Sequence, residues 1–144
     1  MNGMEQSALV ANLIATLLMT GVIWFVQIVH YPLFAFYRDE AFSRHAQRTA
    51  YVVGFPMLIE ALTAFLLLIY RPTNPLFWAG ALLVGLIWLS TNFLQIPRHA
   101  QLESGFDPSA HRSLVKSNWL RTGAWTARSA LMVWAISGAH LGNS

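Results

Sequence analysis

Long apolar runs alternate with short polar stretches along the whole chain. No residue carries a formal charge between Glu5 and Arg38, or again between Arg71 and Arg98. A helix needs about 20 mostly apolar residues to cross ~30 Å of hydrocarbon, and lipid does not tolerate unpaired backbone groups. The pattern therefore predicts an all-α fold, a single integral membrane domain spanning 1–144, with four transmembrane helices running up and down. The predicted helices cover residues 7–30, 50–70, 75–96 and 118–141.

Prolines and polar clusters predict where these helices end. The first helix is expected to stop at Tyr31-Pro32, and the polar segment 71–74 reads as a tight turn beside two prolines. The other two connections are expected to be polar loops, 31–49 and 97–117. A weak internal repeat matches residues 24–30 with residues 92–99. Each copy lies at the end of a predicted helix that runs from outside to inside. The repeat suggests a pair of related helical hairpins.

The composition supports a membrane protein and excludes several functions. The chain is 56% hydrophobic and 10% charged, with a mean hydropathy of +0.47, whereas soluble domains carry about 25% charged residues. The net charge of +3 is small and its cations lie in short connections, which argues against nucleic-acid binding. The chain has no cysteine, so disulfides, thiolate metal sites and thiol redox chemistry are excluded.

Cationic residues gather at one end of the predicted helices. The two polar loops and the start of the last helix hold Arg38, Arg44, Arg48, Arg98, Arg112, Lys116 and Arg121. The end with both termini holds only Arg71. Because Lys- and Arg-rich loops stay in the cytoplasm, we expect loops 31–49 and 97–117 to be cytoplasmic and both termini outside. The protein is expected to be a multi-pass protein of a bacterial inner membrane with the lipid bilayer as its main partner.

Polar residues recur at helical spacing on every predicted helix, and four of the five histidines fall near the cationic end. If these stripes all point inward, they build a polar pocket open to the cytoplasm. The expected catalytic residues are His30, Glu60, His99, His111, Arg121 and Arg128. The expected substrate-binding residues are Gln27, Tyr31, Asn92, Gln95, Asn118 and Trp125.

Glu60 and Arg128 lie at similar depth within their helices. A charge near mid-bilayer costs roughly 3 kcal/mol or more, so the simplest expectation is a buried ion pair with a structural role. The alternatives are that Glu60 transfers protons or binds a metal, or that it is protonated and inert.

His30 and His99 occupy matching positions at helix ends. They read either as solvated caps or as ligands. A transition metal would take both imidazoles together with Glu60, provided that a kink at Pro56 moves Glu60 toward them. A haem could take the two histidines as axial ligands. A site without any cofactor is the third alternative.

The second half of the chain resembles the anthrone-oxygenase-like family of small four-helix membrane proteins. The resemblance rests on the segment 90–97, on His111, and on the segments 118–122 and 125–128. In the first half it rests on Gln27, on 30–32 and on the region of Pro56. It implies oxidation or oxygenation of a hydrophobic phenolic substrate, and it leaves open whether a metal takes part. By matching positions it points to Asn92, His111, Asn118, Arg121 and Arg128.

Three functional hypotheses follow. The first is a membrane oxidoreductase that acts on a hydrophobic small molecule, with a histidine as general base and Arg121 or Arg128 stabilising an oxyanion. The second is a proton or small-solute transporter that uses Glu60 as a relay and requires a homo-oligomer. The third is a non-catalytic membrane partner or lipid-binding protein, in which the cationic residues anchor lipid headgroups.

Overall fold

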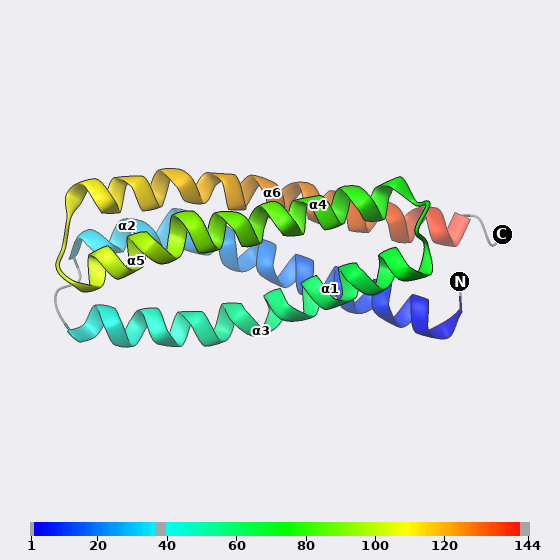
Figure 1. Cartoon of the computed structure of the whole chain (residues 1–144), viewed down its shortest axis with the longest axis horizontal. Helices are drawn as coiled ribbons and strands as arrows, with labels where there is room; N and C mark the ends of the chain where they lie inside the picture. The colour runs from blue at the N-terminus through cyan, green and yellow to red at the C-terminus, as the bar shows by residue number, and fades with distance from the viewer. Residues whose placement is uncertain (1, 37–39, 142–144) are drawn as a thin grey trace.

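The computed structural model describes the backbone of residues 2–36 and 40–141, and the side chains of residues 2–36 and 48–138. Within these residues the fold is all-helical and contains no strand, as predicted. Four long helical segments follow one another along the chain (Figure 1). They are α1 (Gly3–Phe25), continued by η1 (Val26–His30), α2 (Tyr31–Leu33) and η2 (Phe34–Phe36); α3 (Glu40–Tyr70); α4 (Pro75–Ser90), continued by η3 (Thr91–Gln95) and α5 (Ile96–Glu103); and α6 (Pro108–Leu141).

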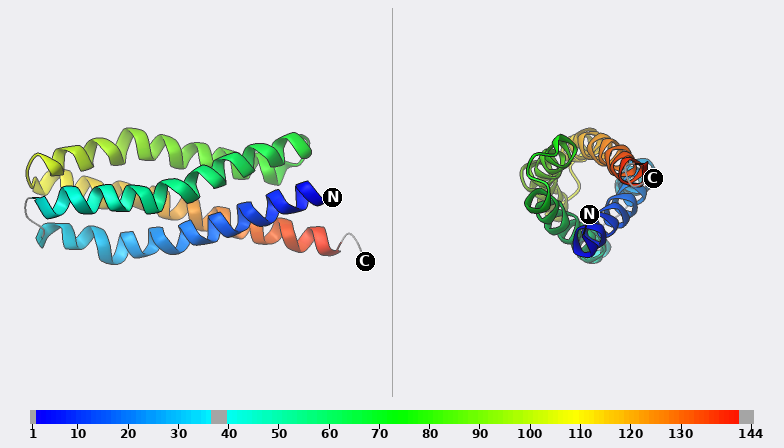
Figure 2. Two further views of the ribbon diagram at one scale, coloured as in Figure 1. Left: turned by 90° about the horizontal axis from the view of Figure 1, so that it is seen from below. Right: turned by 90° about the vertical axis from the view of Figure 1, so that its right-hand side faces the viewer.

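The four segments lie around a common axis, as the end-on view in Figure 2 shows. α1 packs against α3 and α6, and α4 packs against the same two helices. The start of α1, the end of α6 and the turn at 71–74 lie at one end of the molecule (Figure 1). The predicted turn is confirmed: the Asn74 N–H donates to the Arg71 carbonyl, and the Asn74 side chain caps α4 by accepting from the Leu76 N–H.

The helices extend well beyond the predicted boundaries at the opposite end. The expected loops 31–49 and 97–117 are largely helical, and α6 begins at Pro108, ten residues before its predicted start. This correction has a physical reason. A polar stretch that cannot cross lipid can still be a helix in water or among headgroups, and prolines fit the first turn of a helix.

The start of α6 carries its own helix-initiating residue. The Asp107 carboxylate accepts from the backbone N–H of Ser109 at 2.7 Å, which is the usual arrangement of an N-cap. That hydrogen bond, with a second one from the Ser109 hydroxyl, holds the pKa of the Asp107 carboxyl below its ordinary value. The carboxylate therefore stabilises α6 at neutral pH, and this stabilisation is lost only as the pH falls through the lowered pKa.

Polar and apolar residues are distributed in the reverse of the soluble pattern. Buried side chains include Asn12, Gln27, Glu60, Asn118 and Arg128, whereas many large apolar side chains point outward. Three segments, 3–36, 48–70 and 75–103, are long and apolar enough to cross a membrane; α6, with its four cationic residues, is not among them. Extended apolar surface outside and polar groups inside are typical of a protein that lies in lipid.

Candidate functional site

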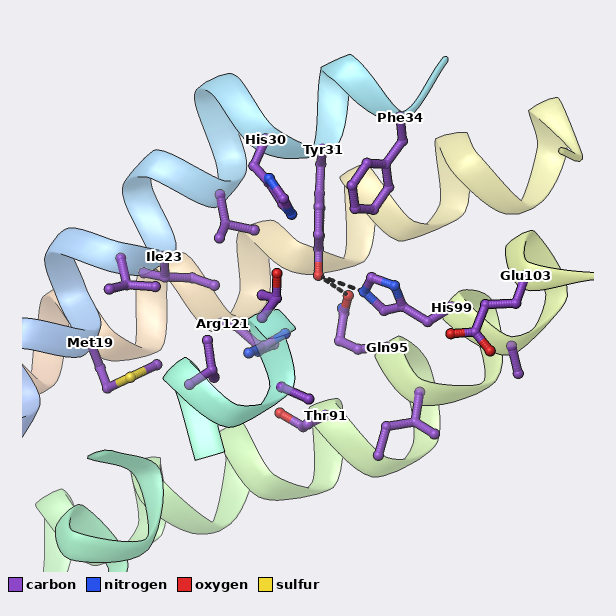
Figure 3. Close-up of a pocket in the computed structure, with 17 residues that line it drawn as sticks. Met19, Ile23, His30, Tyr31, Phe34, Thr91, Gln95, His99, Glu103 and Arg121 are labelled. Atoms are coloured by element: carbon purple, nitrogen blue, oxygen red, sulfur yellow. Dashed lines mark hydrogen bonds between the residues drawn. The ribbon is translucent and has the colours of Figure 1, made fainter. Parts of the chain in front are cut away.

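A central pocket lies between the helical segments near the end where α2 and α5 lie (Figure 3). Its volume is about 340 Å³, which lies in the range of small-molecule sites. Met19, Val22, Ile23, Val26 and Phe34 supply much of its apolar lining. Its polar lining consists of His30, Tyr31, Thr49, Thr91, Gln95, His99, Glu103 and Arg121. The pocket is therefore an apolar cavity with a small number of polar groups.

Two π-helical turns shape opposite sides of this pocket. In each turn a backbone N–H reaches five residues back: Tyr31 donates to Val26, and Ile96 donates to Thr91. Each turn ends two residues before a proline, which has no N–H and whose ring crowds the carbonyl four residues earlier. The wider π turn relieves that crowding, and such turns are frequent at functional sites.

Tyr31 connects three segments at the pocket wall. Its hydroxyl lies 3.1 Å from His99 Nε2 and 3.4 Å from Gln95 Oε1. Its backbone carbonyl accepts a 2.7 Å hydrogen bond from Nε2 of His111; because a carbonyl cannot donate, this nitrogen carries the proton. The single hydroxyl proton can go to either Gln95 or His99, so the Tyr31–His99 contact can pass a proton in both directions.

Aromatic rings fix the positions of the two histidines. The Phe34 ring centre lies 4.8 Å from that of His30 and 5.8 Å from that of His99, with both pairs edge-on. Tyr31 packs beside them at 5.3 Å from Phe34. Edge-on contacts of this kind restrict ring rotation, so both imidazoles are held at the pocket surface.

Arg121 is a buried cation in the pocket wall, and it has no negative partner among the side chains that the structure describes. It is only 5% exposed, and none of the ion pairs among the described side chains includes it. Its Nε is buried and has no hydrogen-bond partner within residues 2–36 and 48–138. The guanidinium lies 5.1 Å from the ring centre of Trp125 and is an electrostatic neighbour of Tyr31. An aromatic face compensates only part of the cost of burying a charge.

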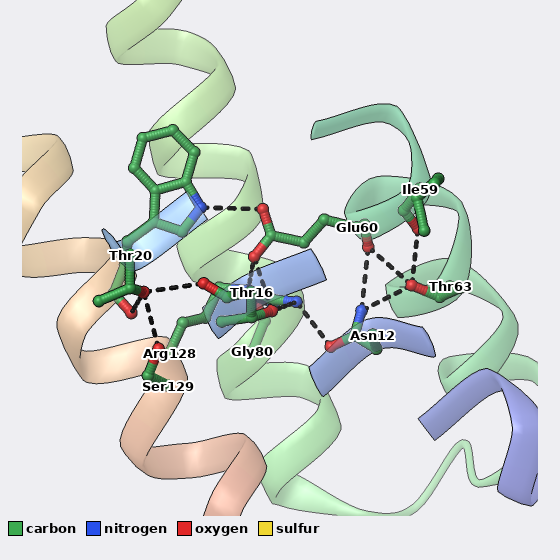
Figure 4. A network of polar contacts seen from close by, with 10 residues as sticks. Asn12, Thr16, Thr20, Ile59, Glu60, Thr63, Gly80, Arg128 and Ser129 are labelled. Carbon is green, nitrogen blue, oxygen red and sulfur yellow. Dashed lines mark hydrogen bonds and ion pairs between the residues drawn. The ribbon is translucent and has the colours of Figure 1, made fainter. Parts of the chain in front are cut away.

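A second polar centre is built around Glu60 and Arg128 (Figure 4). Arg128 Nε donates to Glu60 Oε1 at 2.7 Å, and both side chains are at most 2% exposed. The other carboxylate oxygen accepts from the Trp125 indole at 2.9 Å, and Thr16 donates to the first at 2.8 Å. The predicted ion pair is thus present and its carboxylate is fully occupied by donors.

This polar centre joins all four helical segments. The Arg128 guanidinium also donates to Asn12 on α1 and to the Gly80 carbonyl on α4. The Asn12 amide in turn donates to the Glu60 carbonyl at 3.0 Å and to Thr63 at 2.8 Å on α3. Such a satisfied buried network specifies how helices assemble in an apolar environment.

Gly80 is the point of closest approach in this network, which gives a testable prediction. A Cβ at that position would lie 3.2 Å from Arg128 and 3.2 Å from Met132. Gly80→Ala is expected to destabilise the protein by about 1–3 kcal/mol through overpacking. Gly85→Ala on the same helix has open space around it and is the matched control. Equal stability of the two variants in detergent unfolding would contradict this role of Gly80.

The structure places the predicted site residues in four different settings. His30, Tyr31, Gln95, His99 and Arg121 line the central pocket. Gln27, His111, Asn118 and Trp125 lie around it and hold its walls: Asn118 donates to Gln27 at 2.8 Å, and Gln27 donates to the Val115 carbonyl. Glu60 and Arg128 belong to the buried network, which the Trp125 indole joins to the pocket wall. Asn92 is exposed and donates to the carbonyl of Trp88 in its own helix.

The structure does not bring together the metal ligands predicted from the sequence, His30, His99 and Glu60. Among the described residues, no three His, Asp or Glu side chains come together, and Glu60 is engaged by Arg128, Trp125 and Thr16 instead of facing His30 and His99. Pro56 lies inside α3, which continues through it. The carboxylate therefore remains with its cationic partner, where its burial is compensated.

Several pocket residues were not expected from the sequence. Phe34 and Glu103 fell in predicted loops, and Thr49 lay one residue before a predicted helix. Had helix 1 been continued past Pro32, the spacing of three or four residues from His30 and Tyr31 to Phe34 would have placed these rings together. The prediction that the first helix ends at Pro32 placed Phe34 in a loop and so separated it from the two rings. His45 and the side chains of 40–47 lie outside the described side chains.

Comparison of the chain with family models, with characterised proteins and with solved structures gives no match. The resemblance to the anthrone-oxygenase-like family therefore stays a hypothesis, and the functional argument rests on the geometry of the pocket.

Proposed function

We propose that this chain is a multi-pass membrane protein with four transmembrane helices. Its central pocket binds a hydrophobic small molecule through one acidic oxygen group, such as a phenol or a carboxylic acid. The observation that carries the proposal is Arg121, a buried cation without an anionic partner among the described residues, at the wall of a mainly apolar cavity. A ligand oxyanion would compensate that charge with charge-assisted hydrogen bonds.

The neighbours of Arg121 suit proton removal from such a ligand. Tyr31 interacts with Arg121 on one side and with His99 on the other. A ligand hydroxyl beside Tyr31 can pass its proton through the tyrosine hydroxyl to the His99 imidazole, while the guanidinium stabilises the oxyanion that forms. This is the first step that oxidation of a phenolic or enolisable substrate requires, so it favours the oxidoreductase hypothesis.

Glu60 supports the transporter hypothesis less well. A proton relay must exchange its proton with a pathway, yet both Glu60 oxygens accept hydrogen bonds from buried donors and neither cavity is lined by this residue. The contacts favour a structural role for the Glu60–Arg128 pair.

The length and buried charges of α6 support the proposal that it is a fourth transmembrane helix beside the three apolar segments. Its 34 residues extend over about 50 Å, and its two central charges, on Arg121 and Arg128, are buried in the protein interior. Cationic Arg98, Arg112 and Lys116 lie at the end opposite the turn, which favours a cytoplasmic location for that end and an external one for both termini.

Binding of an acidic head group can be tested with paired ligands. Naphthol and octanoic acid are added to the protein in lipid nanodiscs, alongside methoxynaphthalene and methyl octanoate, which have the same apolar body without the acidic oxygen. We expect the acids to raise the unfolding temperature because they bind only the folded protein, and the blocked analogues to have little effect. Equal stabilisation by acids and blocked analogues would refute the proposal.

The reaction is tested separately with anthrone and dioxygen. Oxidation to anthraquinone consumes one dioxygen per anthrone and releases one water, so oxygen uptake and quinone absorbance must rise together. His99→Gln is expected to abolish most of this turnover while acid binding persists, because the imidazole accepts the proton. Acid binding without any oxygen uptake would instead favour the non-catalytic lipid-binding alternative, which the mainly apolar lining also suits.

A further inference from the structure

A second cavity lies between α1 and α3, and it opens more widely than the central pocket. It has a volume of about 650 Å³. Its outer wall is formed by exposed apolar side chains, among them Leu17, Leu18, Phe25 and Val52. Because these side chains belong to the two apolar segments 3–36 and 48–70, the groove faces the lipid side of the protein. We call it the α1–α3 groove.

The groove and the central pocket share part of their walls. The shared residues are Val22, Val26, His30, Thr49 and Val53. Apart from His30 these are small or medium β-branched side chains. The pocket therefore borders the lipid-facing groove through a thin layer of side chains.

The central pocket and the groove differ in the kind of ligand group that each can bind. The central pocket has buried Arg121, which suits an acidic head group, and the groove is apolar with exposed Arg48 on its border. We infer that the α1–α3 groove is a lateral portal: the ligand of the central pocket is a long-chain acid that enters from the bilayer and leaves its apolar tail in the groove. This inference rests on the proposed function and specifies its ligand class.

Arg48 adds a reason for the direction of approach. An exposed cation near the membrane surface attracts acidic head groups from the adjacent leaflet. A molecule held there by its head has its tail already in the hydrocarbon beside the groove. Because the tail is already out of water, the groove stabilises it through packing contacts, and a chain that occupies both spaces makes more of these contacts than one confined to the central pocket.

Gly21 offers a way to fill the groove without disturbing the central pocket. It lines the groove and not the central pocket, and a Cβ there would meet no atom within 4 Å. Gly85 on α4 has the same open surroundings and lines neither cavity. Gly21→Phe is therefore the test variant, and Gly85→Phe is the control for an added aromatic ring on an exposed helix face.

The experiment measures binding of octanoic and palmitic acids to the protein in lipid nanodiscs, corrected with empty nanodiscs. Gly21→Phe is expected to weaken the binding of palmitic acid by about tenfold, because the added ring occupies the space that the tail needs in the groove, and to leave the binding of octanoic acid unchanged. Unchanged octanoic acid binding also shows that the variant is folded. Gly85→Phe is expected to bind both acids as the parent protein does.

The outcomes separate this inference from the proposed function. The lateral portal is refuted if Gly21→Phe and Gly85→Phe bind palmitic acid equally well. It is also refuted if Gly21→Phe loses octanoic acid binding in parallel with palmitic acid binding. In both cases the acid site at Arg121 can still be correct. If neither acid binds the parent protein more tightly than its methyl ester, the proposed function itself is wrong. If palmitic acid binding is weakened selectively, and only in Gly21→Phe, the result supports both the portal and the acid site.

Discussion

Replacing Arg128 by Met is expected to destabilise the folded protein by about 3–5 kcal/mol, the typical cost of breaking a buried ion pair. The change leaves the Glu60 carboxylate buried with only Thr16 and Trp125 as donors. It also removes the guanidinium bonds to Asn12 and Gly80, and so disconnects α4 and weakens α1 in the network. Glu60→Gln is expected to have a similar effect, since it leaves the cation unpaired.

The measurement is unfolding of the purified protein in mixed micelles with increasing SDS, followed by circular dichroism. The double variant Glu60→Gln with Arg128→Met is expected to recover part of the loss because no uncompensated charge remains. The matched control is Arg71→Met, which removes the other ion pair among the described residues. Arg71 is 49% exposed and pairs at 2.7 Å with Glu5, which is 6% exposed, so its loss should cost less than the loss of Arg128, where both charges are fully buried. Equal effects of Arg71→Met and Arg128→Met would contradict the structural role of the buried network.

The second prediction concerns Arg121, where removal of a buried cation is expected to have the opposite effect on stability. Arg121→Met should weaken binding of octanoic acid by roughly 10- to 100-fold, as expected for losing charge-assisted hydrogen bonds of about 1.5–3 kcal/mol. The ligand-free variant should be as stable as the parent or more stable. Its cation has no anionic partner among the described side chains, and its contact with Trp125 offsets only part of the burial cost.

Two controls make this result specific. Arg112→Met removes an exposed cation of the same helix and is expected to change neither binding nor stability appreciably. Arg121→Lys keeps the charge without the planar fork and should retain part of the acid affinity. A large loss of stability in Arg121→Met, comparable to that of Arg128→Met, would show that Arg121 is a structural group and would remove the main support for the acid site.

These opposite expectations arise from similar sequence positions. Arg121 and Arg128 lie seven residues apart, two helical turns, on nearly the same face of α6, and both were expected to stabilise an oxyanion. Arg128 meets Glu60 on α3, whereas Arg121 faces a cavity. Whether a buried arginine has a counter-ion depends on what the neighbouring helices supply at its level, and residue spacing along α6 contains no information about that.

The internal repeat shows a similar limit. The sequence aligns Gln27 with Gln95 and His30 with the region of His99. The structure aligns the two π turns and their following prolines instead, which pairs Gln27 with Asn92 and His30 with Gln95, a shift of three residues. Consequently Gln95 faces the pocket, Gln27 holds η1 against α6, and Asn92 is exposed. Side-chain identity suggested the repeat, but the backbone position of proline decides which face each residue occupies.

The sequence by itself determined the helical class of the fold, the turn at 71–74 and the presence of helices apolar enough for a membrane, because these depend on local hydropathy and backbone chemistry. It also anticipated the Glu60–Arg128 pair, since isolated charges are too costly in an apolar interior. Only the tertiary structure decided that the helices continue past Pro32 and Pro97, that Tyr31 and His99 meet, and that Arg121 stays unpaired among the described residues. Those outcomes depend on contacts between segments far apart in the chain, and such contacts are fixed when the helices pack together.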